Sequence, residues 1–353
     1  MKSISSSIKL GGAFIGLMAG VGFASGQEVL QFFISYGWPG LAGAVIASLL
    51  MSFLVMTLYM IGSRLKTDSH DEAINFICGP WLGKVMDWMI TFFLFGSVVV
   101  MLAGAGSSAH QQAGVPQALG SAIAAVLTII IVCLGIKRVI TLLSLITPIL
   151  AVMIVVIAIY SLSTMDKSFS ELEKIIRTEP QATNNWFLSA LLYVSYNVAA
   201  TAAMLVVMGG TVKESAKAGI GGLIGGLGVG LLILVMSFAL MAKADVIKGV
   251  EIPTLHLSNQ MSRWFGSVVL VLFQIKLLLT SIGLTFALAA RLRSYGIPFF
   301  WGAALSVSTA YVASLLGFVK LVGIVYPAMG YMGSVLIVCI VFAWVRIWRH
   351  RED

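Results

Sequence analysis

Ten apolar runs, each about as long as a lipid bilayer is thick, constrain this sequence more than any other feature. A helix needs roughly 20 apolar residues to cross the hydrocarbon core of a bilayer. Only 10% of the 353 residues are charged, whereas soluble domains carry about a quarter. The runs are also too long for the short alternating strands of a β-barrel. We therefore predict an all-α polytopic membrane protein with about ten transmembrane helices, over residues 8–33, 41–61, 86–106, 118–135, 139–163, 186–209, 218–241, 268–290, 298–316 and 321–344.

Basic residues in the loops between the runs predict the orientation of the chain. If the amino terminus is cytoplasmic, fourteen of the 22 Lys and Arg residues lie on the cytoplasmic side and seven lie outside. An excess of Lys and Arg in cytoplasmic loops is typical of membrane proteins. We expect a multi-pass protein of the cell (cytoplasmic/inner) membrane with both termini in the cytoplasm. The net charge of +8 is explained in this way and does not indicate a nucleic-acid partner.

The runs divide evenly, with five on each side of a polar segment. We predict a first repeat over residues 1–164, an extracellular loop over 165–185 with a short amphipathic helix at 168–177, and a second repeat over 186–353 with a lid loop at 245–263. Because five is an odd number, the second half enters the membrane from the opposite face. The halves are therefore expected to form a 5+5 inverted repeat, an architecture that recurs in secondary transporters.

The first run contains the stretch GVGFASGQE, residues 20–28, which is poor material for a continuous membrane helix. Glycine lets the backbone leave helical geometry at little steric cost. Unwound backbone inside a membrane must be satisfied by protein, water or ligand. Exposed amides attract an anion such as a carboxylate, and exposed carbonyls attract a cation. Close packing of small residues is the alternative, but packing does not account for Gln27 and Glu28.

The sixth run has a polar centre at the matching place. Its middle reads Ser195, Tyr196 and Asn197, followed by small residues. Asparagine tolerates non-helical backbone better than most residues. We therefore predict that helices one and six are both broken.

These motifs resemble a known group of membrane proteins. The glycine-rich stretch resembles the break in span one of amino acid–polyamine–organocation (APC) transporters, and the ten-span plan is similar to the LeuT fold. GVGFASGQE and SYN resemble the YkvI-like branch of that superfamily. The resemblance implies an ion-coupled symporter that moves a small solute, an amino acid or a related amine or zwitterion, by alternating access. The residues expected to bind the solute are Gly20, Gly22, Phe23, Ala24, Ser25, Gly26, Glu28, Tyr193, Tyr196 and Asn197.

The resemblance also implies a site for a coupling ion on the eighth run. Thr280 and Ser281 form an adjacent hydroxyl pair there, and sodium-coupled members of the LeuT fold use such a pair. Carbonyls near Gly16 and Ala19 would complete the sodium site. The alternative is that both hydroxyls bond to their own helix.

Lys276 lies one helical turn before Thr280 and raises a second interpretation of coupling. A lysine at membrane depth should face the protein interior and have a partner. It could pair with Glu28, its ammonium could take the place of sodium and make coupling protonic, or it could extend to the membrane surface.

The sequence lacks the motifs of the enzyme classes that we considered. It has no zinc-binding HExxH and no phosphate-binding GxxxxGK[ST]. We therefore expect neither an enzyme nor an ATP-driven pump, and no cofactor besides Na⁺ or H⁺. The remaining alternative is a transporter-shaped membrane sensor that binds a small ligand without turnover, since spore-germination subunits belong to the same superfamily.

Overall fold

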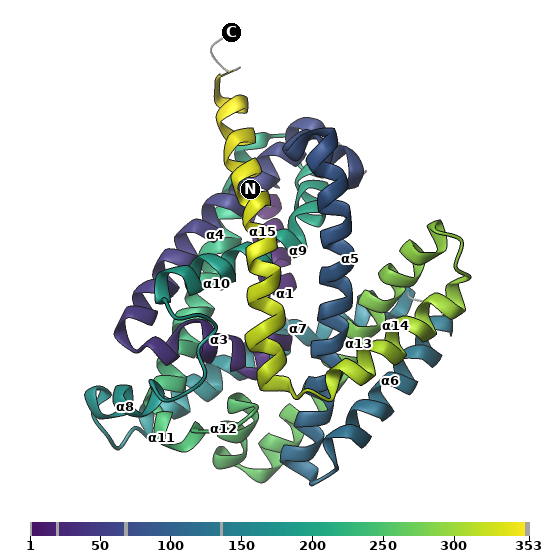
Figure 1. The fold of residues 1–353 in the computed structure, drawn as a ribbon. Helices are drawn as coiled ribbons and strands as arrows, with labels where there is room; N and C mark the ends of the chain where they lie inside the picture. Colours follow the sequence, from purple (N-terminus) through teal and green to yellow (C-terminus); the bar gives the residue numbers. More distant parts are fainter. Residues whose placement is uncertain (1, 19–20, 67–69, 135–136, 350–353) are drawn as a thin grey trace.

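The computed structural model describes residues 2–18, 21–66, 70–134 and 137–349, which form helices joined by short turns and loops (Figure 1). The long helices are α1 (Lys2–Met18), α4 (Trp38–Leu65), α5 (His70–Ala113), α6 (Gln117–Leu134), α7 (Lys137–Ser163), α9 (Trp186–Gly210), α10 (Ser215–Ala242), α13 (Arg263–Ser294), α14 (Phe299–Ser314) and α15 (Phe318–Arg349). The short helices are α2 (Val21–Ser25), α3 (Gln27–Phe32), η1 (Ile34–Tyr36), α8 (Phe169–Ile176), α11 (Ala244–Ile247) and α12 (Pro253–Met261).

Most of the long helices can cross a bilayer. Within the described residues, six are long and apolar enough, and α9 becomes a seventh if its two bent parts form one span. The described chain also contains three shorter apolar helices, Ser6–Met18, Gln117–Cys133 and Phe299–Ser314. The prediction of an all-helical polytopic membrane protein is therefore confirmed.

Exposed apolar stripes on the outer helices show where lipid contacts the protein. On α6 the exposed large side chains recur every three or four residues, at Leu119, Ile123, Val126, Leu127 and Ile130. Continuous apolar surface of this kind is rare on soluble monomers. In a bilayer the same stripe faces hydrocarbon, so α6 lies at the perimeter.

Glycines allow α10 to pack closely against α4. Gly222, Gly226 and Gly230 recur every fourth residue, and a Cβ at Gly226 would lie 2.3 Å from Cα of Ser52. Small residues at this spacing let membrane helices approach at backbone distance. Helix α10 also packs against α1, and α4 packs against α9, so these four form one group. Helix α5 packs against α6, α13 and α14 in a second group.

Three short helices cover one end of the molecule. Helices α8, α11 and α12 lie together at the bottom of Figure 1, and the carboxyl end of α15 lies at the opposite end. Helix α8 forms where the amphipathic pattern predicts it. Ser168 and Glu171 make a capping box at its start, and Leu172 and Ile176 are its buried face.

Candidate functional site

The first membrane span is interrupted, as predicted. Helix α1 ends at Met18, α2 covers Val21–Ser25, and α3 begins at Gln27. Between α2 and α3, Gly26 adopts φ 80° and ψ −12°, the left-handed conformation that other residues rarely enter. Gly22 lies within α2, whereas Ala19 and Gly20 lie outside the described residues. The chain therefore changes direction at Gly26.

The backbone amides next to this glycine are already hydrogen-bonded within the protein. The Gly26 amide donates to the Phe23 carbonyl at 3.1 Å. The Gln27 amide donates to the Ser25 hydroxyl oxygen, also at 3.1 Å. The sequence suggested that amides in this stretch would receive a solute carboxylate, but these two have protein partners.

The carbonyl of Ala24 is also engaged, by a residue from the outer loop. Thr254 on α12 donates its hydroxyl to this oxygen at 2.6 Å, and both residues are buried. A Cβ at Gly26 would lie 3.2 Å from Cγ2 of Thr254. Helix α12 therefore contacts the interruption directly.

Glu28 is the buried carboxylate of the site. Its side chain is on α3, with the residue 6% exposed, and Oε2 accepts a hydrogen bond from the Tyr196 hydroxyl of α9 at 2.6 Å. The Tyr326 ring of α15 lies beside this pair, stacked on the Tyr196 ring with centroids 4.9 Å apart. Three helices thus meet around one carboxylate.

Two further polar side chains of α3, Gln27 and Gln31, are buried beside Glu28. Their residues are 1% and 0% exposed. The side-chain oxygen of each has no hydrogen-bond partner. Sequence reasoning did not include either among the site residues. The signal was present, because positions 27, 28 and 31 lie on adjoining helical faces in an otherwise apolar stretch.

The tyrosines predicted on the sixth span lie against the interrupted helix. Tyr193 is 1% exposed, and its ring packs edge-on against Phe33 and Phe32 with centroids 4.8 and 5.6 Å apart. Tyr196 holds Glu28. Asn197 is placed differently, because its Nδ2 donates to the Tyr193 carbonyl one turn earlier in the same helix, at 2.9 Å.

The sixth span is bent, as predicted, but the bend does not lie at SYN. Helix α9 is continuous through Ser195, Tyr196 and Asn197. The span bends by 56° further along, between Trp186–Ala202 and Met204–Gly210. The physical reason is that the Asn197 side chain bonds to its own helix, and so does the hydroxyl of Thr201, which donates to the Asn197 carbonyl at 2.8 Å. The bend falls among small residues that the sequence did not single out.

Lys276 does not pair with Glu28. It is 5% exposed on α13 and donates to the Thr147 hydroxyl of α7. Glu28 points instead toward α9 and α15. The ion pairs of the described chain join Lys167 to Asp245, Arg177 to Glu173 and Lys217 to Glu214. Lys276 is thus buried at membrane depth, with a hydroxyl as a partner.

The two hydroxyls of the pair on α13 lie in different surroundings. Ser281 is 1% exposed and accepts a hydrogen bond from Thr128 of α6 at 3.3 Å. Thr280 is half-buried and lies one turn after Lys276 on the same helix face. Gly16 lies in α1, with open space where a side chain would project. The assignment of sodium to this pair stays a prediction.

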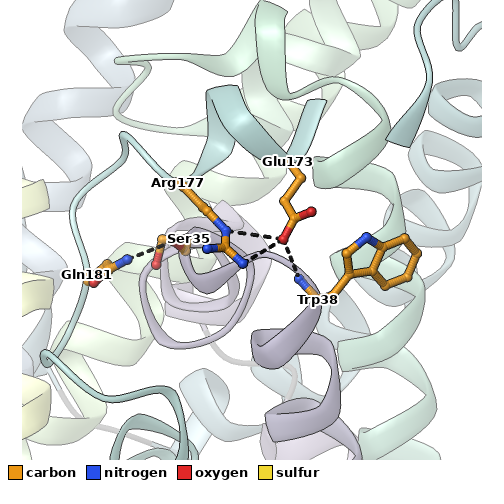
Figure 2. Close-up of polar contacts among 5 residues, drawn as sticks. All are labelled: Ser35, Trp38, Glu173, Arg177 and Gln181. Carbon is orange, nitrogen blue, oxygen red and sulfur yellow. Dashed lines mark hydrogen bonds and ion pairs between the residues drawn. The ribbon is translucent and has the colours of Figure 1, made fainter. Parts of the chain in front are cut away.

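The outer loop is fastened to the turn that follows the interrupted span (Figure 2). Glu173 of α8 accepts hydrogen bonds from Arg177 at 2.7 and 3.1 Å and from the Trp38 amide at 3.3 Å. Gln181 donates to the Ser35 carbonyl at 2.8 Å. A side chain at Gly37 would collide with the Glu173 carboxylate, so glycine is required there.

The lid region over α11 and α12 is held in the same way. Lys167 contacts Asp245 at 2.6 Å, and this hydrogen bond lowers the pKa of the Asp245 carboxyl and raises the pKa of the Lys167 amine. Gln117 donates to the Glu251 carboxylate at 2.9 Å. Further bonds join Gln111 to Ile252 and Glu179 to Gly249. These contacts close the end of the molecule that carries α8, α11 and α12.

Comparison with known proteins places the chain among membrane proteins. It is homologous to "Uncharacterized membrane protein YkvI" of Bacillus subtilis, with 26% identity over 341 residues, covering 95% of each chain. "Uncharacterized protein YyaD" of the same organism is 24% identical over 327 residues, covering 92% of this chain and 93% of its own. No protein-family model matches the chain.

Solved structures reveal the fold. The inward-facing conformation of Mhp1 has a TM-score of 0.61 and 15% identity, over 94% of this chain and 75% of its own. MhsT in complex with L-phenylalanine has a TM-score of 0.59 and 15% identity, over 93% and 86%. An Eremococcus coleocola manganese transporter mutant has a TM-score of 0.58 and 12% identity, over 97% and 78%. The chain has the LeuT-like fold of these transporters.

Proposed function

We propose that this protein is an ion-coupled secondary transporter of a small solute that carries an amine, such as an amino acid or a related molecule. The observation that carries the proposal is Glu28, a carboxylate buried beside an interrupted membrane helix. Interrupted helices at mid-membrane are where secondary transporters bind solute and coupling ion. The fold it shares with Mhp1, MhsT and the manganese transporter supports the same function. It is a transport function rather than an enzymatic one.

The proposed architecture has ten spans in two inverted halves, residues 1–164 and 186–353. The three shorter apolar helices complete the ten. The first span of each half departs from a straight helix, at Gly26 in one and after Ala202 in the other. In this proposal both termini are cytoplasmic and the end closed by α8, α11 and α12 is extracellular.

Alternating access then requires two helix groups that move against each other. One group would contain α1–α4, α9 and α10, and the other α5, α6, α13 and α14, in line with their packing. The hydrogen-bonded outer loops make this conformation one that is closed to the outside. Solute would enter from outside only after those bonds open.

Coupling is proposed to act through α13. Either a sodium ion binds beside Thr280 and Ser281, or the Lys276 ammonium takes its place and a proton is the coupling ion. Uptake into proteoliposomes under an imposed sodium gradient or an imposed proton gradient separates the two. We expect Lys276→Ala and Thr280→Ala to abolish accumulation while the protein remains in the membrane. Normal accumulation by both variants would contradict coupling through α13.

The same uptake measurement tests the function itself. Accumulation that depends on an ion gradient and saturates with solute concentration is expected of a transporter. Saturable binding to the purified protein without accumulation under any gradient would instead identify a membrane sensor, the second candidate. Amino acids and simple amines form the solute panel.

A further inference from the structure

Near the interruption, two backbone donors have hydrogen-bond partners, whereas two side-chain acceptors have none. The amides of Gly26 and Gln27 have partners within the protein. In contrast, the side-chain oxygens of Gln27 and Gln31 are buried with no partner. A buried acceptor without a donor is unfavourable, so the site is suited to a ligand that supplies donors.

The orientation of the Gln31 amide follows from its surroundings. Its Nε2 lies 3.0 Å from the Val319 carbonyl of α15. Because a carbonyl only accepts, the atom facing it must be the nitrogen, and rotating the amide would place two acceptors together. The unpartnered atom of Gln31 is therefore the oxygen.

A glycine lets the α15 backbone approach that oxygen closely. A Cβ at Gly323 on α15 would lie 3.0 Å from Oε1 of Gln31. Tyr326, which stacks on the Tyr196 ring, follows Gly323 by three residues and so lies on the same side of α15. The carboxylate of Glu28 and the oxygen of Gln31 are likewise three residues apart on α3. One seam between α3 and α15 thus carries a charged acceptor and a neutral one.

We propose that Glu28 and Gln31, with Gln27 beside them, form a subsite for an organic cation that carries two or more N–H donors. Its positive charge meets the Glu28 carboxylate, and a second N–H group donates to Gln31 Oε1. A carboxylate on the solute is not needed at this subsite, because its unpartnered side-chain atoms are acceptors and the neighbouring amides of Gly26 and Gln27 already have partners. This inference rests on the proposed function and narrows its solute class from zwitterions to cations.

The test is binding of four probes to the full-length purified protein, measured by thermal shift and intrinsic tryptophan fluorescence. We expect 1,4-diaminobutane and L-alaninamide to bind. L-Alanine should bind more weakly than its amide, because it adds an unneeded carboxylate. Tetramethylammonium, a cation with no N–H group, should not bind. Preferential binding of L-alanine over L-alaninamide, or equal binding of tetramethylammonium, would overturn the subsite.

Matched variants isolate the Gln31 oxygen from general destabilisation. Gln31→Met removes the oxygen together with the bond to Val319. Gln274→Met removes a similar 3.0 Å bond from a membrane-embedded glutamine to the Ala105 carbonyl on another helix pair. We expect Gln31→Met to weaken 1,4-diaminobutane binding at least about tenfold, as for a lost hydrogen bond to a charged group. Gln274→Met should change the affinity for 1,4-diaminobutane by less than about twofold.

The outcomes also separate this subsite from the proposed function. If the cations bind in a Gln31-dependent manner but never accumulate in proteoliposomes, the subsite stands and transport fails. If a zwitterion accumulates and Gln31→Met transports it normally, transport stands and the subsite is wrong. Equal losses of binding in Gln31→Met and Gln274→Met would also count against the subsite.

Discussion

The first and sixth spans have the same position in their halves of the chain but handle polar residues in opposite ways. In the first span, Gly26 turns the backbone, and α3 buries Gln27, Glu28 and Gln31. The side-chain oxygens of the two glutamines have no hydrogen-bond partner. In the sixth span the helix continues through the SYN stretch, and the Asn197 side chain donates to a carbonyl of its own helix. The two spans meet where Tyr196 bonds to Glu28.

This difference shows that a polar cluster in a membrane helix is not by itself a break. Glycine in the left-handed conformation changes the chain direction, and the side chains after it can then point to other helices. Asparagine within a helix can instead bond one turn back and leave the helix intact. In the proposed site, the first span therefore binds the solute and the sixth supplies one wall.

Among the substitutions that test this comparison, Glu28→Gln should have the largest effect. Glutamine keeps an acceptor for Tyr196 but removes the charge, so binding of 1,4-diaminobutane should fall by about 10- to 100-fold, as expected for a charged hydrogen bond. Titration of the purified variant measures it. Glu173→Gln, which changes the partly buried carboxylate of Figure 2, is the control and should bind like the wild type. Unchanged binding by Glu28→Gln would remove the first span from the site.

Gly26→Ala should have the next largest effect. It should lower the free energy of unfolding by about 1–2 kcal/mol, because alanine is disfavoured in the left-handed conformation. The new Cβ would also press on Thr254 at 3.2 Å. A lower midpoint of thermal unfolding in detergent measures it. Gly26→Asn should be less harmful, because asparagine enters this conformation more easily. If alanine and asparagine behave alike, the backbone at position 26 is not the cause.

Thr254→Val tests whether the outer lid holds the interruption. Valine has nearly the same shape but cannot donate to the Ala24 carbonyl, so the loss should be about 0.5–1.5 kcal/mol. Faster hydrogen exchange of amides over residues 21–30 is the expected signature. Thr309→Val is the control, because the Thr309 hydroxyl bonds only within its own helix. Exchange that rises equally in both variants would show that the lid does not hold this segment.

Much of the fold could be predicted from the sequence, because the bilayer imposes the length and composition of each span. The interruption of the first span was also predictable, since its glycines are followed by Gln27 and Glu28, which close helix packing does not explain. The bend after Ala202 was not, because small apolar residues fit straight and bent helices equally well. Tertiary packing, rather than local preference, places that bend.

The sequence identified a site residue only where its side chain is energetically unfavourable in a membrane span and therefore needs an explanation. Glu28 stood out as a carboxylate in a membrane span. Its neighbours did not, because the hydrogen bond from Tyr196 and the stacked ring of Tyr326 depend on how three helices cross. The proposed partner Lys276 was plausible by charge alone, yet it faces Thr147 on another helix. Sequence spacing relates residues on one helix and says little about which helix lies opposite.

Asn197→Ala should have the smallest effect and completes the comparison. The substitution removes one bond from Nδ2 to the Tyr193 carbonyl within a continuous helix. Alanine is a better helix former by up to about 0.7 kcal/mol, which offsets that loss. Both the unfolding midpoint and 1,4-diaminobutane binding should stay near the wild-type values. A loss of binding comparable to that of Glu28→Gln would show that the sixth span contributes its own solute ligand, and that the two spans share the site equally.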